Sequence, residues 1–410
     1  TMEQRKRPIV VRTRAERGDR WWNLLLDGET ESPTEELAFT LPPDLVEEDT
    51  YLNIRAGLTI FDQVVFAFGE DVLDRCLSQP CAEEILGQAV PVLRFGSYLC
   101  SLDEDSKAAI ADTPVAWMIE EGRLELFAAN VSAALWSQQH SDGGWGRVFD
   151  QSDALSTASV LEGLADLEGI RHVSFSEDQL KDGIKWLRQF QSEQTKLLVV
   201  GKTKKLADTL DAYTYLTLLR HGSDSSAMRG FLFKEWKKLT PVGQTMLALA
   251  LHRRGDHQDR NTIRFSLGEE LVKNEATGAI QLKPKNEKYW WKWYGSAAEL
   301  QARYTDFLIR VKGDAPVTDA AAKRLLMTRK RPDFWESSRD SGTALMALLD
   351  YLQLKKGLPN TPGERKLTLW QDDQQLAEST PSAGGMALSV SGHTLVKHVS
   401  STSLTREEAT

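Results

Sequence analysis

Two kinds of helix-forming segment alternate along the middle of this 410-residue chain, and this alternation limits its fold more than any other feature. The first kind is crowded with small and apolar residues and recurs at residues 156–164, 210–216, 240–249 and 341–349. The second kind is amphipathic and ends in polar or basic residues, as at 184–191 and 320–326. A segment that is apolar all round has to be buried, whereas an amphipathic segment covers it from outside. Helical hairpins of this type bury their apolar faces on one another. The pattern therefore predicts a mainly α fold, an α/α toroid of helical hairpins.

Strand-like sequence lies at both ends of the chain. Alternating or apolar runs bounded by turn residues occur at 8–14, 21–26, 37–41, 366–370 and 386–391. Neither end alone offers enough strands for an independent sheet. We therefore expect one small β-sandwich built from both termini, with the toroid inserted into it. The predicted division is residues 1–44 for the first half of the β domain, 45–360 for the toroid and 361–410 for the second half.

Charge and hydropathy exclude several classes of partner. The formal net charge is -9, so the chain lacks the concentrated Lys and Arg that phosphate backbones require, and we expect no nucleic acid partner. No run approaches the ~18 consecutive apolar residues of a membrane span, and the first residues lack the apolar core of a signal peptide. On this basis the segment is either part of a longer secreted chain or cytoplasmic.

Cysteine and histidine usage argues against disulfide and metal frameworks. The three cysteines, Cys76, Cys81 and Cys100, are too few for a dense disulfide scaffold and leave at least one thiol unpaired within the chain. The seven histidines are scattered, and none stands at zinc-binding spacing from a cysteine. We predict no metal site and no cofactor.

Glycine and tryptophan mark two turns between helices, at 138–146 and 331–340. Glycine permits a positive φ, and the tryptophan ring can pack back over the helical hairpin. We interpret both turns as structural staples, that is, as turns whose side chains hold the ends of neighbouring helices together.

Cys81 begins the run Cys81-Ala82-Glu83-Glu84, ten residues ahead of Pro91. If a helix begins here, Cys81 and Glu84 share one face. Together with residues 41–48, 142–145 and 335–341, this run resembles the thioester-containing domain of the alpha-2-macroglobulin and complement family, flanked by its split CUB-type β domain. The resemblance covers nearly all of the chain, and the low cysteine count is similar to the bacterial branch of the family.

The resemblance implies that Cys81 and Glu84 occupy the thioester position, where the family carries a cysteine and a glutamine. A Gln amide expels ammonia when a thiolate attacks it, whereas a carboxylate is a poor electrophile. Glu84 therefore indicates an inactive thioester position. The family's usual aromatic-Gly is replaced by Gln79-Pro80, and residues 191–211, where complement members carry a histidine, contain lysines instead. A second register, in which Cys76 and Gln79 keep the Cys-x-x-Gln spacing, has the wrong interval to Pro91.

The function implied by the resemblance is non-covalent. We expect a fragment of an alpha-2-macroglobulin-like protein that contacts other modules of its parent chain, proteases or another protein partner in protease inhibition or defence. The parent chain would be extracytoplasmic, periplasmic or secreted, and the fragment would not be an enzyme. The aromatic residues Trp290, Trp291, Trp293 and Tyr294 are candidates for an interaction surface or for the core.

Two alternatives stay open. In the first, the domain is an active covalent protease trap, and Glu84 stands for a hydrolysed or mutated Gln. In the second, the helical ring belongs to a terpene cyclase or prenyltransferase-like enzyme, because residues 139–145 loosely match the turns of those enzymes. That chemistry needs an Asp cluster or a zinc site, and the only paired aspartates, Asp372 and Asp373, fall in the predicted β segment.

Overall fold

The computed structural model describes residues 51–56, 59–68, 76–79, 81–147, 151–170, 176–275, 277–283, 296–331, 333–358, 367–371, 374–379 and 386–391. These residues fall into two units. One unit is helical and the other contains strands from both sides of the helical sequence.

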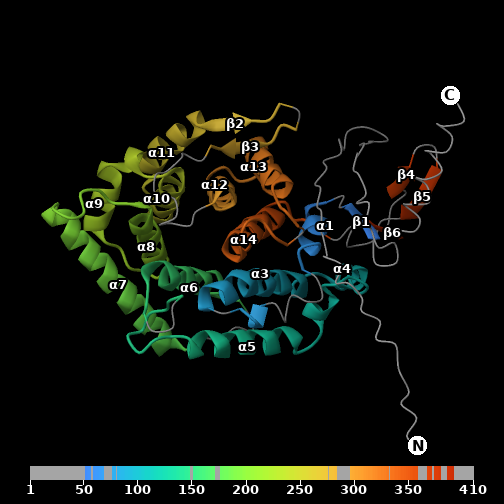
Figure 1. Ribbon diagram of the computed structural model, residues 1–410, viewed down its shortest axis with the longest axis horizontal. Coiled ribbons are helices and arrows are strands. Elements are labelled where there is room, and N and C mark those ends of the chain that lie inside the picture. The colour runs from blue at the N-terminus through green and yellow to red at the C-terminus, as the bar shows by residue number, and fades with distance from the viewer. Residues whose placement is uncertain are drawn as a thin grey trace, which may run out of the picture. The chain divides into compact units, whose positions relative to one another are not determined.

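Six helices of the helical unit form a closed inner ring (Figure 1). They are α3 (Ala82–Cys100), α6 (Ala154–Asp166), α8 (Thr209–Arg220), α10 (Pro241–Arg254), α12 (Ala297–Lys312) and α14 (Ser338–Leu354). Each packs against the next in chain order, and α14 returns to pack against α3. The α/α toroid predicted from the sequence is confirmed by this closure.

A second set of helices surrounds the ring (Figure 1). It comprises α1 (Ile60–Val65), α4 (Glu104–Ala109), α5 (Arg123–Ser137), α7 (Glu177–Val200), α9 (Ser226–Lys234), α11 (His257–Glu269) and α13 (Pro316–Met327), with short 3-10 turns η2 (Ala116–Ile119) and η3 (Trp236–Lys238). Helix α5 packs on α3, α7 on α6 and α8, α11 on α10, and α13 on α12 and α14. All segments predicted as inner or outer helices take those places.

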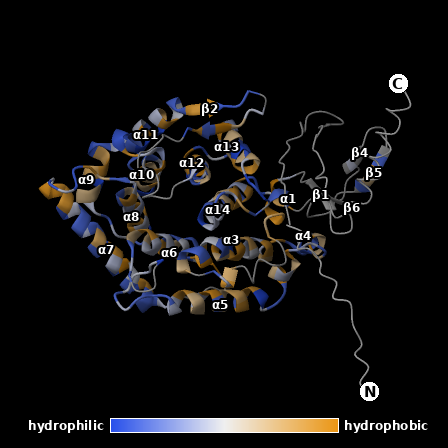
Figure 2. Ribbon diagram, in the orientation of Figure 1, coloured by the Kyte–Doolittle hydropathy of each residue, from blue (hydrophilic) through white to orange (hydrophobic). Residues whose placement is uncertain are grey.

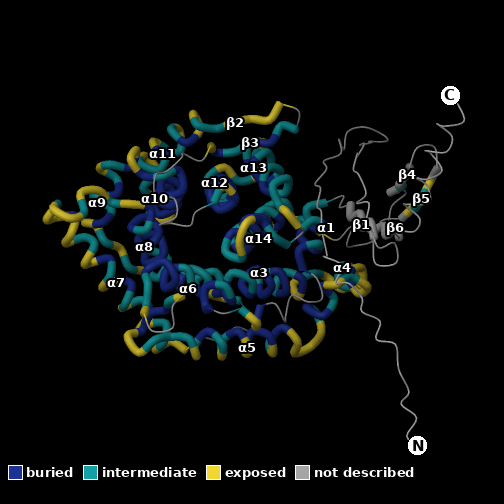
Figure 3. Tube along the Cα trace, viewed as in Figure 1, coloured by how far each residue is buried: buried dark blue, intermediate teal, exposed yellow. Residues whose placement is uncertain are grey.

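Burial follows the predicted difference between inner and outer helices. In α10 every residue from Pro241 to Leu251 is buried, whereas α11 buries only Ile263 and Leu267. Figure 3 shows α8 and α10 mostly dark blue, whereas α7 and α9 carry exposed turns in yellow. Figure 2 shows hydrophilic residues along α7 and α11. An outer helix needs only one apolar stripe, because its other faces meet solvent.

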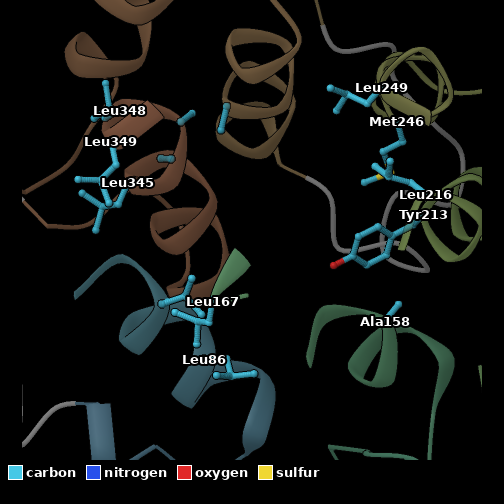
Figure 4. Packing of buried hydrophobic residues seen from close by; sticks show 14 of the residues in the cluster. Leu86, Ala158, Leu167, Tyr213, Leu216, Met246, Leu249, Leu345, Leu348 and Leu349 are labelled. Carbon is cyan, nitrogen blue, oxygen red and sulfur yellow. The ribbon is translucent and has the colours of Figure 1, made fainter. Parts of the chain in front are cut away.

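Apolar side chains from several inner helices make up the core. Figure 4 shows Leu86 of α3, Ala158 of α6, Leu216 of α8, Met246 of α10 and Leu345 of α14 as members of one buried cluster. Since each ring helix contributes to this cluster, the helices stabilise one another in sequence around the ring.

The two Gly/Trp turns hold the ends of neighbouring helices together. Trp145 is 1% exposed, and its indole Nε1 donates to the carbonyl of Leu135 in the last turn of α5 at 3.2 Å. Its backbone N–H donates to the hydroxyl of Thr157 at the fourth position of α6 at 2.9 Å. Gln139 donates to the carbonyl of Gly143 at 2.8 Å. These bonds are internal to the fold, which confirms the interpretation of the turn as a structural staple.

One hairpin inside the helical unit departs from the sequence prediction, which assigned only helices to this region. Strands β2 (Leu271–Lys273) and β3 (Ile280–Leu282) pair antiparallel, with Leu271 opposite Leu282. Gly278 has a positive φ of 69° in the turn between them. Strand β3 packs against α12 and α13. Such short strands carry too little periodicity to be separated from helix by pattern alone.

The second unit contains two strand pairs. Strand β1 (Tyr51–Ala56) pairs with β6 (Met386–Ser391), and β4 (Leu367–Gln371) pairs antiparallel with β5 (Gln374–Ser379). Strands β4 and β6 coincide with strand-like segments of the sequence, while the segments at 8–14, 21–26 and 37–41 lie outside the described residues. Strand β1 lies within the range 45–360 that the sequence assigned to the toroid. The β-sandwich and the three-part division of the chain stay predictions.

Candidate functional site

Cys81 lies at the N-cap of α3, the helix that closes the ring against α14. Its φ and ψ of -140° and 156° are extended, and its carbonyl accepts the first helical hydrogen bonds, from Glu84 at 3.1 Å and Ile85 at 3.0 Å. The helix begins at Ala82, so Cys81 and Glu84 share its first turn. Their roles stay predictions.

The environment of the Cys81 thiol lowers its reactivity. The residue is buried, at 8% exposure, and this burial raises the pKa of the thiol above its usual value. The nearby carboxylates of Glu84 and Glu83 raise the thiol pKa further, whereas the backbone N–H of Glu84 and the guanidinium of Arg147 lower it. Since the thiolate is the nucleophile, the net rise in the thiol pKa reduces the share of thiolate at neutral pH.

Glu84 is half-buried one turn into α3. Its acidic side chain suits the positive end of the helix dipole. A carboxylate has no leaving group comparable to ammonia, so carboxylates do not condense spontaneously with thiols in water. Cys81 and Glu84 together form the start of α3.

Glu83, between them, was not singled out by the sequence analysis, yet it makes the strongest contacts of this turn. Its side chain is 2% exposed and accepts from Arg147 Nε at 2.8 Å, with Arg339 Nε at 3.8 Å. Arg147 follows the first Gly/Trp turn and Arg339 lies in the first turn of α14. Glu83 therefore fixes the Cys81 end of α3 to two other parts of the ring.

From Glu83 a chain of charged side chains continues through the inner helices. Arg339 donates to Glu299 of α12 at 2.7 Å, and Arg303, one turn further along α12, donates to Glu162 of α6 at 2.7 Å. We call this set the axial network; it consists of Arg147, Glu83, Arg339, Glu299, Arg303, Glu162, Arg220 and Asp166. Its four arginines equal its four carboxylates in number, and every side chain except that of Arg147 is at most 19% exposed. Buried charges of this kind are paired with opposite charges.

Glu162 is the most connected carboxylate of the axial network. Besides Arg303, it accepts from the Tyr213 hydroxyl at 2.6 Å and lies 3.7 Å from Arg220. Burial alone would raise the pKa of Glu162, but Arg303 and Arg220 outweigh it and hold the pKa at about 2. Glu162 is thus ionised throughout the physiological range.

Similar pairing joins further inner helices. Asp350 of α14 accepts from Arg94 of α3 at 2.8 Å and from Arg310 of α12 at 3.2 Å, and Arg310 also lies 2.8 Å from Asp306. Removing one partner of a buried pair is strongly destabilising, because the other charge stays buried and uncompensated. These pairs therefore join α14 to α3 and to α12.

Residues 191–211, where the complement members carry a histidine, have a structural lysine here. Lys204 lies 2.7 Å from Asp211 and 3.0 Å from Asp208, at the start of α8. Lys202 and Lys205 are exposed. The groups that shift the pKa of the Cys81 thiol are Glu83, Glu84 and Arg147, and none of these belongs to this segment.

The structure does not describe the remaining candidates from the sequence, which are Trp290, Trp291, Trp293, Tyr294, Asp372 and Asp373. Across the part of the chain that the structure describes, no three His, Cys, Asp or Glu side chains are grouped to hold a metal ion. None of the described helices is both long and apolar enough to cross a bilayer.

The fold is similar to that of bacterial alpha-2-macroglobulins. Native alpha-2-macroglobulin from Escherichia coli, solved from domain MG7 to the C-terminus, matches with a TM-score of 0.51 at 18% identity, over 79% of this chain and 46% of that one. Salmonella alpha-2-macroglobulin reacted with methylamine matches with a TM-score of 0.53 at 14% identity, over 84% and 20%. A point mutant of the Salmonella protein gives 0.54 at 14% identity, over 84% and 22%.

At these identities the similarity shows the fold alone. The chain spans less than half the length of each of these structures. The sequence matches no protein-family model and no curated protein.

Proposed function

We propose that this chain is the thioester-domain region of a bacterial alpha-2-macroglobulin-like protein that works without a thioester. It acts as a scaffold that docks non-covalently onto other modules of its parent chain or onto a protein partner, in protease inhibition or defence. The parent protein is extracytoplasmic, and the domain is not an enzyme. The shared fold supports the family assignment.

One observation carries the loss of the thioester. At the position of the family's cysteine and glutamine, a buried thiol with a raised pKa shares a helical turn with a carboxylic acid. A thiol and a carboxylate do not condense spontaneously in water, so acylating power cannot be stored at this site. What such a domain retains is its shape and surface.

Intact mass with thiol titration, before and after methylamine, tests this proposal. The freshly purified protein should show three free thiols, one for each cysteine, and should take up no methylamine. The Salmonella relative, which was solved after reaction with methylamine, serves as the positive control. Uptake of one methylamine with release of one thiol would instead establish the covalent trap.

A binding measurement tests the docking part. The variant Cys81→Ala should bind the remaining modules of the parent chain as tightly as the unmodified domain. A covalent trap would lose all acyl transfer in this variant, so this single substitution distinguishes the two mechanisms.

A further inference from the structure

The C-terminal end of α7 exposes a group of apolar side chains. Leu197, Val199 and Val200 are 39%, 70% and 62% exposed, and Leu206, just beyond the helix, is 41% exposed. Among the described residues nine large hydrophobic side chains are exposed, and four of them lie in this stretch of ten. Single exposed apolar residues are ordinary, but a cluster indicates an interaction surface.

Exposed cations border this cluster. Arg188, Lys196, Lys202 and Lys205 are exposed, and within the described part of the chain they make no ion pair or side-chain hydrogen bond. The chain as a whole carries a net charge of -9. This local excess of positive charge is therefore opposite in sign to the rest of the protein. We call the four apolar residues and these four cations the α7 patch.

Contacts with α7 and α8 anchor the segment that follows α7 and carries part of the α7 patch. Lys204 turns inward, where its ammonium group contacts Asp211 at 2.7 Å and donates to Gln194 of α7 at 2.9 Å. Gly201 ends α7 with a φ of 67°, a conformation suited to glycine. Because the segment after α7 is already anchored, binding costs little ordering entropy.

A groove opens within the α7 patch, and four members of the patch line it: Arg188, Lys196, Val199 and Val200. It has a volume of about 470 Å³ and lies between one face of α7, where Arg188, Thr195 and Val199 follow helical spacing, and the turn at residues 223–225 that leads into α9. Among the described residues that line the groove, Asp224 is the one carboxylate, and it already accepts from the Tyr215 hydroxyl at 2.8 Å and from Arg254. The charge left for a ligand is therefore positive.

We propose that the α7 patch docks a protein segment whose apolar side chains are bordered by aspartate or glutamate. The valines and leucines require an apolar partner surface, and the four cations require acidic groups around it. The groove gives room for a protruding side chain, which favours a protein segment over a flat lipid surface. The inference rests on the docking part of the proposed function and names the surface that makes the contact, but it does not depend on the state of Cys81.

The test uses the full chain and a fluorescent synthetic peptide in which two adjacent leucines are bordered on both sides by glutamates. Fluorescence anisotropy should show binding that weakens as salt is raised, because exposed charges are screened. The double variant Val199→Ser with Val200→Ser should weaken binding about tenfold through loss of buried apolar area. Lys202→Gln with Lys205→Gln should weaken it to a similar degree, mainly at low salt.

Matched controls remove the same groups elsewhere. Phe265→Ser takes away an exposed apolar side chain of α11, and Lys283→Gln with Lys312→Gln removes the same charge from another face. Both controls should bind like the unmodified chain.

Four results would overturn the proposal. The first is that the acidic peptide does not bind, and the second is that a peptide with glutamine in place of glutamate binds as tightly as the acidic one. The third is that the control variants weaken binding as much as the α7 patch variants do. The fourth is that the chain binds phosphatidylserine vesicles but not the peptide. Each concerns the α7 patch alone, so none depends on the methylamine result at Cys81.

Discussion

Gly342 of α14 and Gly87 of α3 bring the last and first helices of the inner ring into backbone contact. A Cβ atom placed on Gly342 would lie 2.1 Å from the carbonyl oxygen of Gly87. Backbone cannot move aside as a flexible side chain can. Gly342→Ala should therefore lower the free energy of unfolding by about 1–3 kcal/mol or more, measured by urea denaturation.

Gly230 of α9 provides the control for this substitution. No atom lies within 4 Å of a Cβ built there, and the residue sits inside an exposed helix. Gly230→Ala should raise the free energy of unfolding by about 0.5–1 kcal/mol, because alanine favours the helix. If both substitutions shift stability equally, the close approach of α3 and α14 is not what closes the ring.

Trp335, in the second Gly/Trp turn, makes the same two kinds of hydrogen bond as Trp145 makes in the first. Its indole donates to the carbonyl of Leu325, ten residues before it, at 2.9 Å, and its backbone N–H donates to Ser341 at 3.1 Å, the fourth residue of α14. Trp335→Phe loses the indole donor and leaves a void, so it should cost about 1–4 kcal/mol. Thermal unfolding of this variant and of Trp145→Phe should give similar losses.

Trp186 offers the comparison for these two tryptophans. Its indole bonds to Asp142 at 2.9 Å in an exposed setting, where water can replace the lost bond. Trp186→Phe should therefore cost less than about 1 kcal/mol. A loss as large as that of Trp335→Phe would show that the shared bonding pattern is not the source of stability.

The ring itself could be predicted from the sequence because its signal is repeated. Segments such as 240–249 carry small, apolar or uncharged residues on every side, which favours inner helices, and the glycine and tryptophan turns mark where the helices end. The hairpin of β2 and β3 could not be predicted in this way. Three-residue strands give no period, and the packing of β3 against α12 and α13 cannot be read from local sequence.

The axial network could be predicted only in part. Glu162 stands in an otherwise apolar inner segment, which is a usable signal for a buried, paired charge. Its partner Arg303 lies 141 residues away, and Arg339 reaches Glu83 across the closure of the ring. Those pairings follow from ring closure, and no local spacing encodes them. The sequence therefore shows that a charge is buried, and the fold shows with which group it pairs.

Glu162 gives a pH dependence of stability. Its folded-state pKa of about 2 lies below the ordinary value of 4.5. A depressed carboxyl pKa contributes stability above pH 4.5, and this contribution is lost as pH falls from about 4.5 toward 2. The shift corresponds to about 3 kcal/mol. Glu162→Gln should therefore be less stable than the unmodified protein at pH 7, with the difference shrinking below pH 4.5 in urea titrations.

An exposed pair supplies the control for this pH test. Glu120 lies 3.7 Å from Arg123, and both side chains are more than half exposed. Such pairs contribute about 0–1 kcal/mol, so Glu120→Gln should leave the pH profile unchanged. A constant stability difference between Glu162→Gln and the unmodified protein from pH 7 to 3 would contradict the assignment of Glu162 as a strongly paired carboxylate.

The three cysteines should differ in their reaction with iodoacetamide in the native protein. Cys100 is exposed, whereas Cys76 and Cys81 are buried and burial raises the pKa of the Cys81 thiol. Alkylation depends on thiolate and access, so Cys100 should be modified first and Cys81 only after denaturation, as read by peptide mass mapping at neutral pH. Cys100→Ala should then leave the native protein almost unreactive. Rapid alkylation of Cys81 in that variant would mean that its thiol is accessible and ionised, and would remove the chemical basis for treating the Cys81 position as inert.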